Sequence, residues 1–243
     1  TLYAYQGLYA TGMNNFNEPG IMISRLPNST LKWETNLQFN VGVDFAMFNK
    51  LSGTIEYFKR KSKDLLFTMP MAPSTGFGGI DRNIGDVENY GIEFTLNYVP
   101  FSSKDFTWTI DLNGTSYENK ITKLPQDEMN SGYFKWREGE SRFNFWGIEY
   151  AGVNPENGND QYWMVVDKED GSTERVKTED YNAVSSDKHK KYLGDALPTL
   201  FGGLTNSFSY KGIDFSFMIY YSLGGKLYDG DYAQAMAYRQ GYS

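Results

Sequence analysis

A strict alternation of residues between Lys32 and Phe48 is the feature that most constrains this chain. The segment reads KWETNLQFNVGVDFAMF, and its odd-numbered positions carry Trp33, Thr35, Leu37, Phe39, Val41, Val43, Phe45 and Met47. Successive side chains of a β-strand point to opposite faces, so the segment predicts a strand with one apolar and one polar face. A helix would need apolar residues three and four positions apart, whereas here they fall two apart.

The length of this segment points to a membrane. At about 3.4 Å per residue the strand is about 55 Å long, several times a typical soluble strand. Tilted by about 45° it rises about 40 Å, which is enough to cross the apolar band of an outer-membrane barrel, roughly 25 Å tall. We therefore expect the apolar face to contact lipid and the polar face to line a hydrated lumen.

Further strands and their connections fit the same architecture. Long alternating segments are predicted over residues 51–62, 87–99, 199–210 and 213–222 and from Phe106 onward, and shorter β segments over 142–166 bring the total to roughly eight strands. The connections at Asn49-Lys50, PFSSKD and Lys211-Gly212 are short. The connections at 66–85, 119–141, 167–198 and 223–243 are long. In outer-membrane barrels short connections are periplasmic turns and long ones extracellular loops, so we expect these four segments to be extracellular.

Composition excludes several classes of function. The 243 residues carry a net charge of -7, which argues against a nucleic-acid partner, because that would require a basic stripe. The chain has no cysteine and a single histidine, so disulfides, thiolate metal sites and nucleophile–base pairs are not expected. The chain begins at Thr1 without a signal peptide, and an exported barrel needs one, so we expect a longer polypeptide.

Four stretches resemble one known family. LPNSTLKWETNLQFNVGVDFAMFNKLSGTIEYFKRKSKDLL, NIGDVENYGIEFTLN, YAGVNPENGNDQYW and LGDALPTLFGGLTNSFSYKGIDFSFMIYYSLGG are similar to successive parts of the barrel of SusC-like TonB-dependent outer-membrane transporters of Bacteroidetes. They occur in the order of that family and cover most of the chain from Leu26 to Gly225.

The resemblance implies an all-β, antiparallel transmembrane barrel of about 22 strands with a plugged lumen. It implies TonB-dependent import of oligosaccharides or peptides across the cell outer membrane, with a SusD-like surface lipoprotein as lid and no enzymatic activity. No plug, TonB box or aromatic-ended last strand is found, so residues 1–243 are expected to be part of one barrel domain from the C-terminal half. TonB would be contacted through the missing N-terminal part. The substrate is not indicated.

Candidate site residues follow from the strand faces and the loops. Carboxylates and an amide on polar strand faces are candidates for the lumen wall, where they would either shape substrate passage or merely be hydrated or contact the plug. These residues are Glu34, Asn40, Asp44, Glu93, Asp111 and Asp214. Three loop aromatics are candidates for contact with substrate or lid, namely Phe77, Trp136 and Tyr228.

The same sequence also bears on other functions. No cofactor is expected, although oxygens around Asn154, Asn157 and Asp160 offer a calcium site as well as an ordinary turn. The lone His189 lies in a charged loop and is expected to be solvated. The main rival is a secreted soluble β-rich protein that binds carbohydrate. An outer-membrane enzyme would need a catalytic constellation that the sequence lacks.

Overall fold

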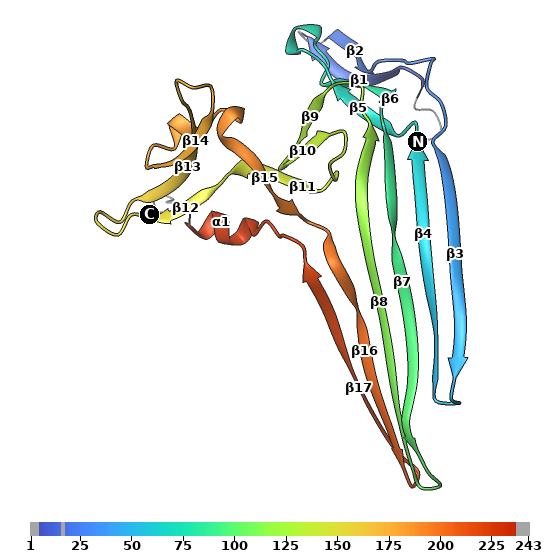
Figure 1. The fold of residues 1–243 in the computed structure, drawn as a ribbon. Helices are drawn as coiled ribbons and strands as arrows, with labels where there is room; N and C mark the ends of the chain where they lie inside the picture. Colours follow the sequence, from blue (N-terminus) through green and yellow to red (C-terminus); the bar gives the residue numbers. More distant parts are fainter. Residues whose placement is uncertain (1–4, 16–17, 237–243) are drawn as a thin grey trace.

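A single sheet of six long antiparallel strands dominates the computed structural model, which describes residues 5–15 and 18–236 (Figure 1). The strands contain 12 to 18 residues each. Neighbouring strands pair over most of their length, although β16 pairs with β8 only from Phe106 to Thr115 of β8. In spatial order they are β17 (Ile213–Gly224), β16 (Pro198–Tyr210), β8 (Phe106–Lys123), β7 (Asp86–Ser102), β4 (Leu51–Lys63) and β3 (Thr35–Met47).

Nearly unbroken register keeps the two faces of this sheet distinct. β3 pairs with β4 from Thr35↔Lys63 to Met47↔Leu51 without a shift. Because the pairing does not slip, residues that share a row across the strands also share a face. One row runs Phe45, Gly53, Leu96, Leu112, Leu204 and Ile219. We call the face that carries this row the apolar face and the opposite one the polar face.

Three short turns connect these strands at one end of the sheet (Figure 1). Phe48 and Asn49 both have positive φ, and the amide of Lys50 donates to the carbonyl of Met47, as in a type I′ turn. Lys211 and Gly212 also have positive φ and join β16 to β17. Type I′ turns match the right-handed twist of long strands, so they fix the register from this end.

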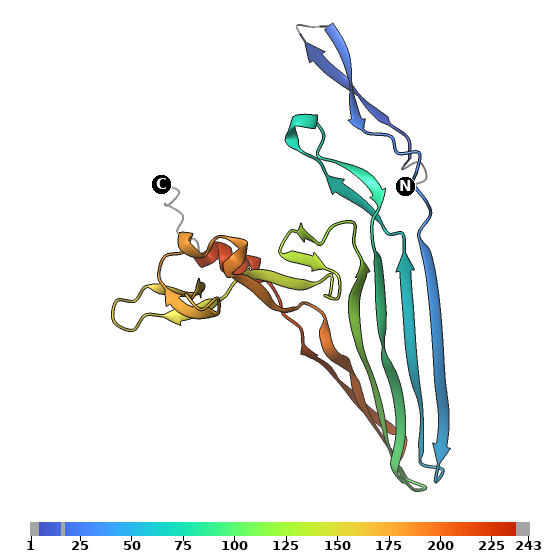
Figure 2. The same cartoon turned by 45° about the horizontal axis from the view of Figure 1, so that its top comes forward.

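Smaller sheets and helices gather at the opposite end, where the connections are long (Figures 1 and 2). β5 (Leu66–Pro70) and β6 (Gly79–Asn83) extend the β4–β7 pair past a bend, where Asp64 and Gly85 have positive φ. The strands here are β1 (Leu8–Asn15), β2 (Glu18–Arg25), β5 (Leu66–Pro70), β6 (Gly79–Asn83), β9 (Glu128–Ser131), β10 (Phe134–Arg137), β11 (Asn144–Ile148), β12 (Tyr150–Val153), β13 (Asp160–Asp167), β14 (Thr173–Thr178) and β15 (Lys190–Asp195). The helices are η1 (Pro73–Thr75), η2 (Asn182–Val184), η3 (Asp187–His189) and α1 (Gly230–Met236).

A small apolar core ties this end together. Val87 and Ile121 are paired residues of the polar face, and Trp136 of β10 packs against them. Phe67 of β5 meets the Trp136 ring edge-on, with 4.6 Å between the ring centroids. The β9–β10 hairpin therefore folds over the loop end of the polar face of the long sheet.

Two expectations about local structure need correction. The long sheet has six strands in the described residues instead of roughly eight, because the segments between 142 and 166 form short strands in two separate small sheets. The segment 66–85 is largely a β-hairpin, since the β4–β7 ladder continues into β5 and β6. Antiparallel all-β architecture itself is confirmed. Within the described chain, no helix has the length and hydropathy needed to span a bilayer.

Two neighbouring glycines of β16 offer a test of this packing. A Cβ on Gly202 would lie 2.1 Å from the carbonyl oxygen of Asn113, whereas a Cβ on Gly203 would meet nothing closer than 3.6 Å. We expect Gly202→Ala to destabilise the sheet by about 1–3 kcal/mol, as overpacking does. The effect is measured as a lower temperature for the heat-induced mobility shift of the full-length protein on SDS gels.

Gly203→Ala is the matched control, because it adds the same methyl group one residue away on the other face. Its transition temperature should stay close to that of the unchanged protein. Equal shifts for the two variants would contradict the close approach of β16 and β8 at Gly202.

Candidate functional site

The apolar face exposes large hydrophobic side chains over the whole sheet. Val41, Val43, Ile55, Ile92 and Ile219 are each about half exposed or more, at 49–64%. Soluble monomers rarely expose contiguous apolar patches larger than a few hundred Å². A six-stranded face of this composition therefore requires an apolar environment, which a lipid bilayer provides.

Aromatic rings concentrate on the apolar face near the short turns. Trp108 and Phe208 stack with their centroids 5.7 Å apart, and the Trp108 indole N–H donates to Asn206 Oδ1 at 3.1 Å. The other rings of this group are Phe101, Phe106, Phe215 and Phe217. Aromatic side chains with a satisfied polar tip favour the boundary between hydrocarbon and water. The cluster thus lies where the girdle of a membrane barrel is expected.

The polar face carries five of the six polar candidates. Asn40, Asp44, Glu93, Asp111 and Asp214 occupy it by strand register. Thr54 donates to Asp44 at 2.6 Å, and Asn97 donates to Asp111 at 2.6 Å, so both carboxylates are held by a neighbouring strand. Glu34 lies one residue before β3 and has a structural role, because its Oε1 accepts the backbone N–H of Leu66 at 2.7 Å.

A shallow hollow in the polar face combines aromatic and polar side chains. Phe58, Tyr117 and Phe201 line it together with Arg60 and Glu93. The Tyr117 and Phe201 rings meet edge-on at 6.2 Å. The remaining lining residues are Gln38, Asn40, Asn89 and Thr115. Aromatic surfaces beside a few convergent polar groups are the usual makeup of a small-molecule site.

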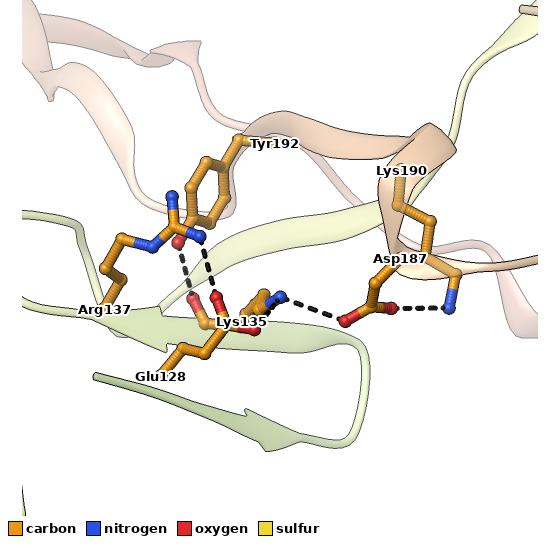
Figure 3. Close-up of polar contacts among 6 residues, drawn as sticks. All are labelled: Glu128, Lys135, Arg137, Asp187, Lys190 and Tyr192. Atoms are coloured by element: carbon orange, nitrogen blue, oxygen red, sulfur yellow. Dashed lines mark hydrogen bonds and ion pairs between the residues drawn. The ribbon is translucent and has the colours of Figure 1, made fainter. Parts of the chain in front are cut away.

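A buried lysine fastens the loops at the far end (Figure 3). Lys135 of β10 is only 3% exposed, and its ammonium pairs with Glu128 at 2.6 Å and Asp187 at 3.0 Å. It also lies 4.4 Å from the centre of the Trp146 ring. Asp187 reaches Lys190 as well, at 3.0 Å. This clamp joins the β9–β10 hairpin to η3 and β15, segments that are about 50 residues apart in sequence.

The electrostatics of the clamp favour its charged form. Hydrogen bonds from Lys135 and Lys190 lower the pKa of Asp187 to about 2, and hydrogen bonds from Lys135 and Arg137 lower the pKa of Glu128. Burial opposes the charge on Lys135, but its hydrogen bonds to Glu128 and Asp187 outweigh burial and raise its pKa. Lys135, Glu128 and Asp187 therefore all stay ionised at neutral pH.

The three candidate loop aromatics have different surroundings. Tyr228 is 47% exposed and stacks on Tyr133 with centroids 4.3 Å apart. Phe77 is half-buried in the β5–β6 hairpin just after η1. Trp136 is 6% exposed in the core, and its indole N–H donates to the carbonyl of Arg142, so its predicted contact with substrate or lid does not fit this position. Its burial follows from the inward fold of the β9–β10 hairpin.

Two loop clusters behave differently from the simplest expectation. The amides of Asn154, Asn157 and Asn159 all donate to the carboxylate of Glu179, whose pKa they lower. His189 is not merely solvated, because its Nδ1 accepts the backbone N–H of Val165 at 3.1 Å. Within the described residues, no group of three or more histidines and carboxylates is arranged to hold a metal ion.

Sequence reasoning missed the Lys135 clamp and the stacking of Arg142 on aromatic rings. Lys135 lies in the segment 119–141, which the sequence predicts as a long connection, and Arg142 begins the segment 142–166, which it predicts as short β structure. The alternation of β10, which reads FKWR, places Lys135 and Trp136 on opposite faces. This alternation predicts that β10 has two faces, but it does not predict that other parts of the chain cover both of them.

Comparison with known proteins gives consistent matches over nearly the whole chain. A family model described as "TonB dependent receptor-like, beta-barrel" matches residues 3–242. TonB-dependent receptor P3 of Formosa agariphila is 32% identical over 242 residues, covering 93% of this chain and 24% of that protein. TonB-dependent receptor SusC of Bacteroides thetaiotaomicron is 34% identical over 218 residues, covering 83% and 20% respectively.

The fold gives a similar result. A solved structure of the RagAB peptide importer in its "closed-closed" state matches with a TM-score of 0.79 and 26% sequence identity. The match covers 92% of this chain and 25% of that one. The chain thus spans about a quarter or less of the length of the proteins it matches.

The two faces of β3 lead to a first test. Val41 lies on the apolar face and its neighbour Asn40 on the polar face. Val41→Arg should cost roughly 2–4 kcal/mol if this face meets the middle of a bilayer, and Asn40→Arg should cost far less. The measurement is unfolding of the full-length protein in lipid vesicles by denaturant. Equal tolerance at both positions would argue strongly against a lipid-facing surface.

The clamp makes a prediction about pH. The pKa of Asp187 is about 2 in the folded protein against an ordinary value of 3.8, so its ionisation stabilises the loops above about pH 4 and this is lost as the pH falls toward 2. Because Asp187 is partly exposed, we expect protection of residues 128–137 against hydrogen exchange to fall by about tenfold or less. The measurement is exchange, corrected for intrinsic rates, on the full-length protein.

In the Asp187→Asn variant, the protection of residues 128–137 should already be reduced at neutral pH. It should therefore show no further loss of protection as the pH falls from about 4 toward 2. Asp127→Asn serves as the control, since Asp127 is exposed and next to Glu128 in sequence. A control variant that loses as much protection as Asp187→Asn would remove the clamp as the explanation.

Proposed function

Since the chain belongs to the TonB dependent receptor-like β-barrel family, we propose that the protein containing it imports nutrients actively and that this chain supplies part of the barrel wall. Receptors of this family are outer-membrane proteins and are not enzymes, and the same holds for this chain. This chain spans only about a quarter of the length of its relatives, so import is proposed for the whole protein and not for this chain alone.

The division of the long sheet into two faces supports this assignment most directly. Its apolar face exposes aliphatic residues on β3, β4, β7 and β17, and its polar face carries amides, hydroxyls and carboxylates. In the proposed function the apolar face contacts lipid and the polar face lines the route of the substrate. The rival assignment, a secreted soluble carbohydrate-binding protein, would leave the apolar face in water at a large energetic cost.

We further propose two partners. A SusD-like surface lipoprotein would close the mouth formed by the small sheets, and TonB would supply energy through a part of the polypeptide outside this chain. The support is the likeness to SusC and to the RagAB peptide importer. The segments 66–85, 119–141, 167–198 and 223–243 would face the lipoprotein, although residues 237–243 of the last lie outside the described structure.

The proposed cargo is an oligosaccharide or a peptide. One solved structure that this chain resembles is that of a peptide importer, and this likeness makes a peptide one of the two candidates. In this chain the hollow around Phe58, Tyr117 and Phe201 offers aromatic surface with amide and carboxylate neighbours, which suits either cargo. Asn40, Asp44, Glu93, Asp111 and Asp214 would shape the passage.

The test begins with fractionation of the native source. The full-length protein should require detergent for extraction and should co-purify with a lipoprotein identified by mass spectrometry. Uptake of its cargo should be lost, by about tenfold or more, when TonB is deleted. Extraction without detergent as a soluble protein of about the mass of this chain would overturn the proposal and favour the soluble carbohydrate-binding alternative.

A further inference from the structure

Arg142 is held rigidly at the edge of the polar face. It lies in the turn between β10 and β11, and its backbone N–H donates to Oδ1 of Asn119 on β8 at 2.9 Å. Its carbonyl accepts the indole N–H of Trp136 at 3.0 Å. Asn119 and Trp136 are both buried, so the backbone of Arg142 is fixed on either side by packed side chains.

Aromatic rings surround the guanidinium of Arg142. Its central carbon lies 5.1 Å from the centre of the Phe67 ring, 5.2 Å from that of Trp136 and 5.9 Å from that of Phe143. These rings attract the cation through their faces, but they offer no acceptor for N–H groups in the guanidinium plane. The rings therefore orient the group and leave its hydrogen-bonding edge unused.

In the described part of the chain, the Arg142 side chain makes no hydrogen bond and has no carboxylate within ion-pair distance. Arg137, by contrast, pairs with Glu128 at 2.7 Å, and Arg175 pairs with Glu149. Glu34 acts on Arg142 through its charge only, while its Oε1 accepts the amide of Leu66. Burial lowers the pKa of Arg142, which reflects a charged group removed from water without an acceptor.

We propose that Arg142 forms a binding site for a carboxylate that comes from outside the described residues. A guanidinium matches a carboxylate through two parallel N–H···O bonds, and pre-orientation by the rings reduces the entropy lost on binding. The carboxylate has two possible sources, which are an acidic cargo and an acidic side chain of the remaining polypeptide. The site itself does not depend on which molecules the protein transports.

The experiment uses the full-length protein in detergent and the Arg142→Lys variant, which keeps the charge. A water-soluble carbodiimide links an amine to a carboxylate that it contacts, and mass spectrometry then identifies the partner. We expect at least about tenfold more cross-link at position 142 than at position 82 in the matched Arg82→Lys variant, because Arg82 is exposed on β6 and unstacked. The added probe is tetraglutamate, with tetraglutamine as its neutral counterpart.

Each outcome decides between sources. A cross-link to a residue of the same polypeptide beyond these 243 residues assigns the site to an internal partner, and an adduct with tetraglutamate assigns it to a soluble ligand. A cross-link to Glu34, or equal yields at positions 142 and 82, overturns the proposal.

A second measurement uses the unchanged protein and so does not depend on whether the Arg142→Lys variant folds. In the unchanged protein, phenylglyoxal should modify Arg142 at least about tenfold more slowly than Arg82. This difference should be present without any addition if the carboxylate is internal, and should appear on addition of tetraglutamate if it is a soluble ligand. Tetraglutamine should add no protection. Equal rates for the two arginines under every condition would overturn the proposal.

Discussion

The nearly unbroken backbone ladder of the six-stranded sheet is the constraint on which the rest of the molecule depends. In hydrocarbon every backbone N–H and C=O must find a partner within the protein, so strands can cross a bilayer only in register with neighbours on both sides. The ladder between β3 and β4 runs for 13 residue pairs without a slip. A shift by one residue would send Val41 and Val43 to the polar face and Asn40 and Asp44 into lipid. β3 and β17 are the edges of this sheet, and such edges must be paired with further strands in a membrane.

The loop end obeys a different constraint. There the strands are short and form small separate sheets, so the structure is held by a small core around Trp136 and by ion pairs that are partly shielded from solvent. Lys135 is nearly fully buried while its partners Glu128 and Asp187 remain partly exposed. Removing one partner of a buried cation is costly, and the three-way arrangement reduces that cost because one acid remains. The clamp therefore fixes the shape of the loops without a large hydrophobic core.

The sequence predicted the long sheet well and the loop end poorly, for physical reasons. Alternation over ten or more residues can be satisfied only by a strand between two different environments. The segments predicted at 32–48 and 213–222 therefore match β3 (Thr35–Met47) and β17 (Ile213–Gly224) closely. Short segments carry no such information. Trp136 reads as a loop aromatic, yet it is buried because Val87 and Ile121 place an apolar patch at the loop end of the polar face. Glu34 continues the alternation of β3, but its carboxylate fastens β5, a contact 32 residues away that no local pattern contains.

The environment of the polar face follows from one cross-strand pair. Glu56 of β4 stands directly opposite Glu93 of β7, and neither has a hydrogen-bonding or ionic partner in the described residues. Two like charges about 4–5 Å apart repel by about 1 kcal/mol in water but by many times more in a medium of low dielectric constant. The pair is therefore compatible with a hydrated surface and incompatible with a dry core or with lipid. Because water weakens such interactions, the charged side chains of this face contribute little to folding, in contrast to the buried Val87 and Ile121 at its loop end. Such charged residues can therefore vary with little loss of stability, whereas the proposed contact with lipid requires the apolar face to stay apolar.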